Sequence, residues 1–160
     1  MPQTRQLAAI MFTDITGFTS LMGNDEQKAF QSLAQFKSIA QPLVEKFHGH
    51  WHKDLGDGAL MSFFNVQDAV QGAIAIQKEI NQKTDFHLRI GIHLGDITFK
   101  DGDVFGDGVN IASRIQSEAT PGGICISESI AKNISIFQHN FPLVKANTQL
   151  KMFSGITLLL

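Results

Sequence analysis

The chain of 160 residues has one cysteine, little net charge and no long apolar run. Its single cysteine, Cys125, excludes an intrachain disulfide and fits a reducing compartment. No apolar run approaches the roughly 18 residues that a membrane-spanning helix needs, and the N-terminal MPQTRQ lacks the apolar segment of a signal peptide. A net charge of -2 gives no general attraction to nucleic acid or to membranes. We therefore expect a cytoplasmic protein in which any phosphate binding is local.

The composition is that of a globular domain. Hydrophobic residues make up 43% of the chain and charged residues 18%, which is typical of a protein with an apolar core. A chain of 160 residues is long enough for one such core and too short for two comfortable ones. We therefore predict a single domain over residues 1–160.

The hydrophobic pattern predicts the order strand, helix, strand, strand, helix, strand. The predicted strands have short apolar runs, and the predicted helices have apolar residues spaced three and four apart. In chain order these elements are 8–12, 25–47, 50–55, 59–64, 66–80 and 88–94. This order favours an α+β fold, a ferredoxin-like βαββαβ antiparallel sheet with its helices on one face.

Further elements are expected towards the C-terminus. Gly95-Asp96 predicts a turn into a partner strand at 97–99, and 100–105 is typical of a loop or edge arm. Asp107 is expected to cap a helix that runs through Ile115. The remaining predictions are a strand at 124–126, a short helix at 127–133 and one or two late strands within 137–160.

An aspartate follows the first predicted strand. Asp14 is costly to place near a core unless a cation or hydrogen-bond donors compensate its charge. The backbone N–H groups from Ile15 to Thr19 lead into a helical pattern, and we expect them to converge as an anion-binding helix entrance. A cation ligand beside such an entrance indicates a site for a metal and a polyphosphate. The alternative is an acid that caps a helix in an ordinary domain.

A second aspartate, Asp57, lies at the tip of the predicted hairpin turn Gly56-Asp57-Gly58. If the two strands are neighbours, Asp14 and Asp57 face one another and repel unless divalent cations neutralise them. Mg²⁺ takes a few carboxylates and fills its other positions with water and phosphate oxygens. The pair therefore indicates a two-metal site for phosphoryl transfer. The alternative is that both acids merely form turns.

Four segments together resemble the signature segments of one enzyme family. They are FTDITGFT (12–19), KDLGDG (53–58), LRIGIHLGD (88–96) and DVFGDGVNIASR (103–114). In this order and spacing they are similar to the class III nucleotide cyclase catalytic domain, from about residue 7 to about residue 129. The resemblance implies a ferredoxin-like domain that pairs head to tail, with its active sites at the dimer interface.

The resemblance also implies roles for individual residues. Asp14 and Asp57 match the two metal-binding aspartates, with the carbonyl of Ile15 completing one coordination shell of the two Mg²⁺ or Mn²⁺ ions. Arg89 matches an arginine on the triphosphate. The phosphate-holding turn corresponds to Thr16, Gly17, Phe18 and Thr19.

Four more positions match residues that act on the nucleoside. Lys53 and Asp103 match the pair that reads the base, while Asn110 and Arg114 match the pair that orients the ribose and stabilises the transition state. By resemblance these four come from one subunit and Asp14, Asp57 and Arg89 from the other.

The base-reading pair can be tested against the chemistry of the purines. Adenine presents an acceptor at N1 and a donor at N6, so a lysine and an aspartate complement it. Guanine presents the reverse pattern, and the mismatch would leave buried polar groups unpaired at about 1–3 kcal/mol each. Lys53 with Asp103 therefore favours ATP over GTP. The implied reaction is attack of the ATP 3′-oxygen on the α-phosphorus, which yields 3′,5′-cyclic AMP and pyrophosphate.

Several alternatives remain open from the sequence. Lys53 alone is typical of a solvated surface lysine. Arg89 is also typical of a polar residue on the outer face of a half-buried strand. Asp101 is an alternative to Asp103 as the base-reading acid. Among the alternating His48, His50 and His52, a zinc site would need a further ligand or an open catalytic position. The late basic residue that the family offers to the triphosphate corresponds to either Lys145 or Lys151.

Three functions are compared. The leading one is a homodimeric adenylate cyclase, because one sequence carries both halves of the site. The first rival is a non-catalytic nucleotide-binding or regulatory cyclase-like domain, in which a metal aspartate or the transition-state pair is normally lost. The second is a ferredoxin-like nucleic-acid-binding module, which the acidic balance disfavours.

Overall fold

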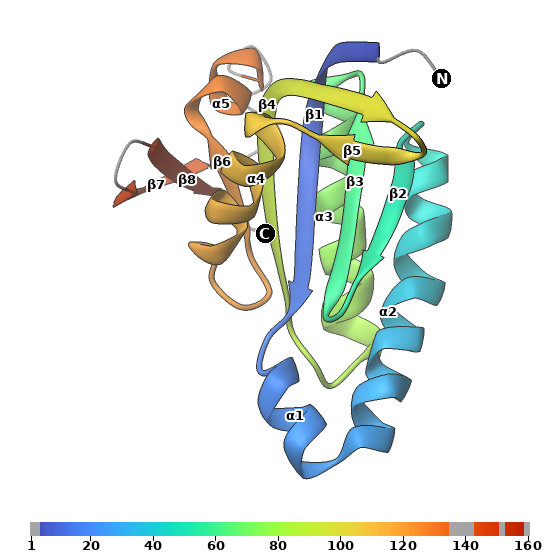
Figure 1. The fold of residues 1–160 in the computed structure, drawn as a ribbon. Helices are drawn as coiled ribbons and strands as arrows, with labels where there is room; N and C mark the ends of the chain where they lie inside the picture. Colours follow the sequence, from blue (N-terminus) through green and yellow to red (C-terminus); the bar gives the residue numbers. More distant parts are fainter. Residues whose placement is uncertain (1–3, 135–142, 151–152, 159–160) are drawn as a thin grey trace.

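Figure 1 shows the computed structural model, which describes residues 4–134, 143–150 and 153–158. The strands form one sheet in the order β2-β3-β1-β4-β6-β8-β7, with β5 attached to β4. The elements are β1 (Thr4–Ile15), α1 (Phe18–Asn24), α2 (Glu26–Lys46), β2 (His50–Leu55), β3 (Gly58–Phe63), α3 (Val66–Lys83), β4 (Leu88–Lys100), β5 (Asp103–Phe105), α4 (Asp107–Ser117), β6 (Ile124–Ser127), α5 (Glu128–Ile134), β7 (Leu143–Leu150) and β8 (Phe153–Leu158).

The predicted α+β fold is confirmed. The elements β1, α2, β2, β3, α3 and β4 follow the βαββαβ order, and β1 pairs antiparallel with both β3 and β4. β6 then adds to β4 in parallel, and β8 and β7 extend that edge. The late strands that the sequence predicts are present as β7 and β8.

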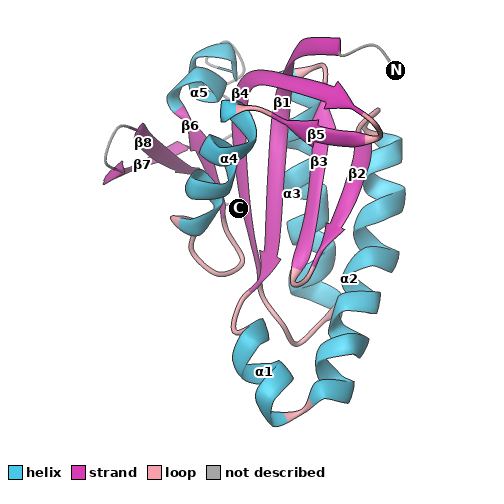
Figure 2. Cartoon of the chain, viewed as in Figure 1, coloured by secondary structure: helices cyan, strands magenta, loops and turns pink. Residues whose placement is uncertain are grey.

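The core has two faces, because successive side chains of β1 point to opposite sides of the sheet. Figure 2 shows α4 in front of the sheet and α3 behind it. Ala9 and Met11 point to the side where α2 and α3 pack, and we call this the α2/α3 face. Ala8 and Ile10 point to the other side, where they meet Ala112 of the additional helix α4, and we call this the α4 face. The two helices of the βαββαβ core thus share one face, as predicted, whereas α4 covers part of the opposite one.

The two core helices begin at side-chain caps that the sequence carries. Asp25 accepts a hydrogen bond from the backbone N–H of Lys28 at the start of α2, and Asn65 accepts one from Asp68 at the start of α3. Their buried residues recur at three- and four-residue spacing, which turns one stripe of each helix towards the sheet. In α2 these residues are Ala29, Ser32, Phe36, Ala40 and Val44.

One predicted turn is wrong. Gly95-Asp96 does not reverse the chain, because β4 continues to Lys100 and its second half pairs with Thr4–Ala8 of β1. The reversal comes at Asp101 and Gly102, whose φ angles are 52° and 75°. The long β1 supplies backbone partners for the extended strand, and a local reading of Gly95 cannot detect them.

The predicted cap of the following helix also differs. Gly106, with a φ of 133°, is the N-cap of α4, and Asp107 lies in the first turn instead. A Cβ at Gly106 would lie 2.9 Å from the carbonyl oxygen of Asp96, so the entry to α4 is pressed against β4. Glycine suits both the positive φ and this close approach.

Candidate active site

Asp14 and Arg89 form the most enclosed ion pair of the predicted site. They are direct partners across β1 and β4. The Arg89 Nε donates to Asp14 Oδ1 at 2.9 Å and Nη2 donates to Oδ2 at 2.6 Å. Their side chains are only 14% (Asp14) and 28% (Arg89) exposed, and the pKa of Arg89 is raised by the hydrogen bonds with Asp14. A guanidinium thus neutralises the predicted metal ligand in the free chain.

The orientation of Arg89 is completed by a contact that the sequence did not reveal. Nη1 of Arg89 donates to the backbone carbonyl of Ser117 at 3.1 Å, at the end of α4. Because any residue type supplies a carbonyl, no sequence signal marks this acceptor. The contact ties α4 to the charged end of β1 and β4.

Asp57 lies beside Asp14, as the sequence predicts. β2 and β3 are neighbours, and Asp57 occupies the turn between them. Its carbonyl accepts a hydrogen bond from the Ile15 N–H at 2.8 Å. A Cβ at Gly58 would lie 1.8 Å from the Thr13 carbonyl oxygen, so glycine is required where the hairpin meets β1.

The carboxylates of Asp57 and Asp14 interact electrostatically. Burial raises the pKa of Asp57, and the nearby Asp14 carboxylate raises it further. A shift of this sign means that the environment disfavours a second negative charge. The donor set of two carboxylates and a nearby backbone carbonyl consists only of hard oxygen ligands, which fits Mg²⁺ or Mn²⁺. A bound divalent cation would relieve the repulsion.

In the predicted phosphate turn, two of the backbone N–H groups are already hydrogen-bonded within the chain. The Ile15 N–H is bound to the Asp57 carbonyl, and the Thr16 N–H is bound to the His87 carbonyl at 2.9 Å. Gly17 is the N-cap of α1 in a left-handed conformation, with a φ of 72°. The N–H groups of Phe18 and Thr19 lie in the first helical turn, which has no intrahelical acceptors. The backbone N–H groups of Ile15 and Thr16 are thus already bonded within the chain, and the assignment of Thr16, Gly17, Phe18 and Thr19 to a phosphate stays a prediction.

Lys53 and Asp103 meet although they are 50 residues apart. The Lys53 Nζ donates to Asp103 Oδ1 at 3.0 Å, and the backbone N–H of Val104 donates to the same oxygen at 2.8 Å. Both interactions lower the pKa of Asp103, Lys53 more than Val104. The competing Asp101 lies in the exposed turn before β5. The structure therefore pairs Lys53 with Asp103.

A β-bulge turns Lys53 towards this partner. Trp51 pairs with Met61 and Lys53 pairs with Leu60, so two steps along β2 correspond to one along β3. Strict alternation would place Lys53 on the same side as Trp51. The bulge instead places His52 and Lys53 both on the α4 face, where the ring of His52 contacts Phe99 at 5.3 Å.

The arm formed by the end of β4 and β5 lies over this face (Figure 1). Val104 of β5 belongs to the same apolar cluster as Ile10 and Leu60, so the arm crosses over β1 and β3. Asp103 is thereby placed above β2. The predicted loop or edge arm is confirmed as this structure.

Asn110 and Arg114 lie on exposed positions of α4, one turn apart. Within residues 4–134 neither side chain has a hydrogen bond or ion pair. α4 itself is held close to the sheet, since a Cβ at Gly91 of β4 would lie 2.2 Å from the backbone nitrogen of Gln116. Asn110 and Arg114 therefore extend from a helix that packs tightly on the sheet, but they do not contact the other predicted site residues.

The other candidates from the sequence are the three alternating histidines and the two late lysines. The rings of His50 and His52 lie with their centres 4.5 Å apart and their planes tilted by 48°, while His48 lies near Asp68 on another part of the surface. Among the described residues no group of three or more histidines, cysteines or acids is arranged to hold a metal. Lys145 belongs to β7, but its side chain lies outside the described part of the chain, and so does Lys151 altogether.

Comparison with known proteins identifies the family. The model of the adenylate and guanylate cyclase catalytic domain matches residues 1–153. This chain is a member of that family. The cyclase domain is 40% identical over 134 residues to putative adenylate cyclase 3 of Rhizobium meliloti, and this match covers 79% of this chain and 23% of that protein. It is 31% identical over 128 residues to an adenylate cyclase of Streptomyces coelicolor, with 79% of this chain and 34% of that protein covered.

Solved structures agree with this assignment. The cyclase domain superimposes on an adenylate/guanylate cyclase/hydrolase from Silicibacter pomeroyi with a TM-score of 0.88 and 28% identity, covering 99% of both chains. It has the same fold as the adenylyl cyclase CyaB from P. aeruginosa, with a TM-score of 0.83 at 21% identity over 100% of this chain and 96% of that one. The chain spans about a quarter to a third of the length of the two curated relatives. Within the described ranges, no helix combines the length and apolar character needed to cross a bilayer.

Proposed function

We propose that this cyclase domain is an adenylate cyclase, which converts ATP to 3′,5′-cyclic AMP and pyrophosphate at sites shared by two copies of the chain. The observation that carries the proposal is the 3.0 Å contact between Lys53 and Asp103. The similar protein from Streptomyces coelicolor is named adenylate cyclase and that from Rhizobium meliloti putative adenylate cyclase 3, which supports the same substrate.

To recognise adenine, Lys53 and Asp103 would break their contact with each other and bind the base instead. Lys53 donates to adenine N1 and Asp103 accepts from N6, so each exchanges a contact with its partner for one with the base. Both side chains are nearly half exposed in the free chain, at 41% and 45%, so their mutual attraction is modest. Guanine offers a donor at N1 and an acceptor at O6, and would leave both residues unpaired.

Asp14 and Asp57 would hold two divalent cations, together with the carbonyl of Ile15. When bound, these cations lower the pKa of the ribose 3′-hydroxyl and neutralise charge on the phosphates. The raised pKa of Asp57 marks the place where that positive charge is needed. Arg89 holds both oxygens of Asp14 in the free chain, so it would turn from Asp14 to the triphosphate as the cations and nucleotide enter.

The reaction forms a bond between the 3′-oxygen and the α-phosphorus, breaks the bond from that phosphorus to the leaving pyrophosphate, and releases the proton of the 3′-hydroxyl to solvent. Asn110 orients the ribose so that the 3′-oxygen lies in line with the leaving group. Arg114, one helical turn further on, places its guanidinium over the equatorial oxygens as charge develops there. The N–H groups of Phe18 and Thr19 bind the β- and γ-phosphates at the start of α1.

A second copy of the chain would complete each site. Asn110 and Arg114 are exposed on α4 without partners among residues 4–134, and the α4 face also exposes Phe105 of the arm, at 51%. In the proposed homodimer, Asp14, Asp57 and Arg89 of one subunit face Lys53, Asp103, Asn110 and Arg114 of the other. A two-fold axis then produces two equivalent sites.

The direct test is an assay of the purified domain with Mn²⁺ or Mg²⁺ and either ATP or GTP. We expect cyclic AMP from ATP and little cyclic GMP from GTP. Cyclic GMP as the main product would refute the base assignment, and nucleotide binding without either product would support the non-catalytic alternative.

The shared site has its own test, which uses two inactive variants. Asp57→Ala and Arg114→Ala damage opposite halves of the proposed site. When the two proteins are mixed, heterodimers should contain one intact site and one doubly damaged site, and part of the activity should return. Mixing two copies of Asp57→Ala is the control. If the mixture stays as inactive as that control, the site is not formed between subunits.

A further inference from the structure

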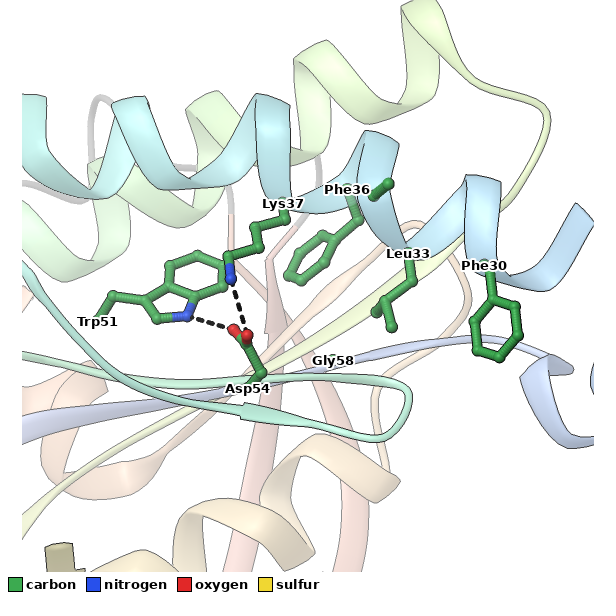
Figure 3. A pocket seen from close by; sticks show the side chains of 8 residues that line it. Phe30, Leu33, Phe36, Lys37, Trp51, Asp54 and Gly58 are labelled. Carbon is green, nitrogen blue, oxygen red and sulfur yellow. Dashed lines mark hydrogen bonds and ion pairs between the residues drawn. The ribbon is translucent and has the colours of Figure 1, made fainter. Parts of the chain in front are cut away.

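A cavity lies between α2 and β2, across the sheet from the α4 face (Figure 3). It has a volume of about 220 Å³, larger than the roughly 150 Å³ apolar cavity that accommodates one benzene ring. Aromatic and aliphatic side chains from α2 and the only tryptophan of the chain form most of its wall. They are Phe30, Leu33, Phe36 and Trp51.

The walls are suited to an aromatic ring. Phe36 and Trp51 lie with their ring centres 5.8 Å apart and their planes tilted by 40°, a geometry that aromatic pairs favour. Phe30 leaves 52% of its surface exposed at the rim, where a bound ring would cover it. An inserted ring would thus gain aromatic contacts on several sides and bury apolar surface on both partners.

Of the two charged side chains that line this cavity, Lys37 and Asp54, it is Asp54 that can accept further hydrogen bonds. Asp54 Oδ1 accepts from the indole N–H of Trp51 at 2.8 Å, and Oδ2 accepts from Lys37 Nζ at 2.7 Å. Both bonds lower the pKa of Asp54, that from Lys37 first, so the group is a carboxylate. Since each carboxylate oxygen has two lone pairs, Asp54 can accept another donor. Lys37 already balances its charge, so the ligand need not be charged.

We propose that this cavity binds a small uncharged aromatic molecule that carries a hydroxyl or N–H donor for Asp54. We further infer that its occupancy adjusts the metal-binding hairpin, an inference that rests on the proposed cyclase function. Asp54 is three residues before Asp57, and Gly58 both lines the cavity and abuts Thr13 of β1. A ligand that shifts Asp54 therefore acts on the same short hairpin that carries Asp57.

Binding can be measured without any activity assay, using phenol as the probe. Trp51 supplies the one indole N–H resonance of isotope-labelled protein, and this proton is bonded to Asp54. Phenol should shift the resonance in a saturable way. Toluene, with the same ring and no donor, should bind about ten-fold more weakly. Equal affinities would overturn the role of Asp54, and the absence of a saturable shift up to the solubility limit of phenol would overturn the site.

A matched pair of variants locates the binding. Ala34 is exposed on α2 and lines the cavity, so Ala34→Phe should fill it and abolish the phenol-dependent shift. Gln82→Phe adds the same ring at an exposed position of α3 and should leave the shift unchanged. Thermal melting of both variants checks that they fold. A shift that persists in folded Ala34→Phe would place phenol elsewhere and overturn the proposal.

The effect on the hairpin has a separate measurement. Phenol should move the amide resonances of Gly56 and Gly58 in the wild type but not in Ala34→Phe, and it should change the rate of cyclic AMP formation only in the wild type. Saturable binding with unmoved glycine resonances would overturn the coupling and leave the site. If the domain makes no cyclic nucleotide, the proposed function fails, while the resonance shifts still decide the cavity and the coupling.

Discussion

The α2/α3 face of the sheet carries the large apolar core beneath two long helices, with one cavity between α2 and β2, whereas the α4 face is only partly covered and carries the charged pairs of the predicted active site. On the first face, residues such as Phe36 and Met61 are 0–1% exposed. On the second, Lys53 and Asp103 leave nearly half of their side chains exposed. Buried apolar area stabilises a fold, while exposed and separable polar pairs can exchange partners with a ligand. The α2/α3 face therefore supplies most of the stability of the domain, while the α4 face carries the polar side chains of the proposed reaction.

The largest expected effect comes from removing a charge on the α4 side. Asp57→Ala should lower cyclic AMP formation by at least about three orders of magnitude, because several kcal/mol of charge stabilisation in the transition state are lost. The fold should persist, with an unchanged circular dichroism spectrum. Asp85→Ala, which removes only an exposed ion pair with Lys28, is the control and should remain active. An active Asp57→Ala protein would contradict the metal-ligand assignment.

The complementary change is made on the α2/α3 side, where two adjacent phenylalanines differ in burial. Phe63 is 1% exposed and Phe64 is 69% exposed. Phe63→Ala should lower the free energy of unfolding by about 3–5 kcal/mol, because it leaves a cavity in the core. Phe64→Ala should change it by no more than about 0.5 kcal/mol. Urea denaturation measures both, and equal effects would contradict the assignment of Phe63 to the core that stabilises the α2/α3 face.

A smaller effect is expected from exchanging the base-reading pair. In the double variant Lys53→Glu, Asp103→Cys, the preference should shift towards GTP by at least roughly 30-fold, because two mismatches are exchanged and each costs about 1–3 kcal/mol. Relative kcat/KM values for the two nucleotides measure the shift. Asp101→Asn, in the exposed turn, is the control. An unchanged ratio in the double variant would count against the assignment of Lys53 and Asp103.

The smallest expected effect is a pH dependence of the free energy of unfolding, caused by His52 beneath the arm. Burial, followed by the neighbours His50 and Lys53, lowers the pKa of His52 from 6.5 to about 4. A base with a lowered pKa in the folded state binds protons first in the unfolded state. Its contribution to stability is therefore complete above about pH 6.5 and is lost as the pH falls to about 4.

Because His52 is only half buried, the loss should be roughly 1–2 kcal/mol rather than the full value of the shift. Urea denaturation across this pH range measures it. The ring Nε2 of His52 lies 2.6 Å from the Ser62 hydroxyl. His52→Gln, which keeps a hydrogen-bonding partner for that hydroxyl, should show a flatter profile. A profile as steep as that of the wild type would mean that other groups cause the acid sensitivity.

Much of this architecture could be predicted from local patterns. The apolar stripes of α2 and α3 and the Gly56-Asp57-Gly58 turn are short-range features, and each element formed where its pattern indicated. The wrong turn at Gly95 has the opposite character, because β4 continues only where the distant start of β1 pairs with it. A pattern read over a few residues contains no information about such a partner.

Short-range sequence patterns were sufficient to predict the βαββαβ order, to single out Asp14 and Asp57, and to indicate a cyclase domain. The contacts between these segments became known only from the folded chain. The bulge in β2 turned Lys53 to the α4 face, the arm selected Asp103 over Asp101, and strand register placed Arg89 on Asp14. The physical reason is that propensity and periodicity act between neighbours in the chain, whereas register, bulges and ion pairs depend on which distant segments come into contact.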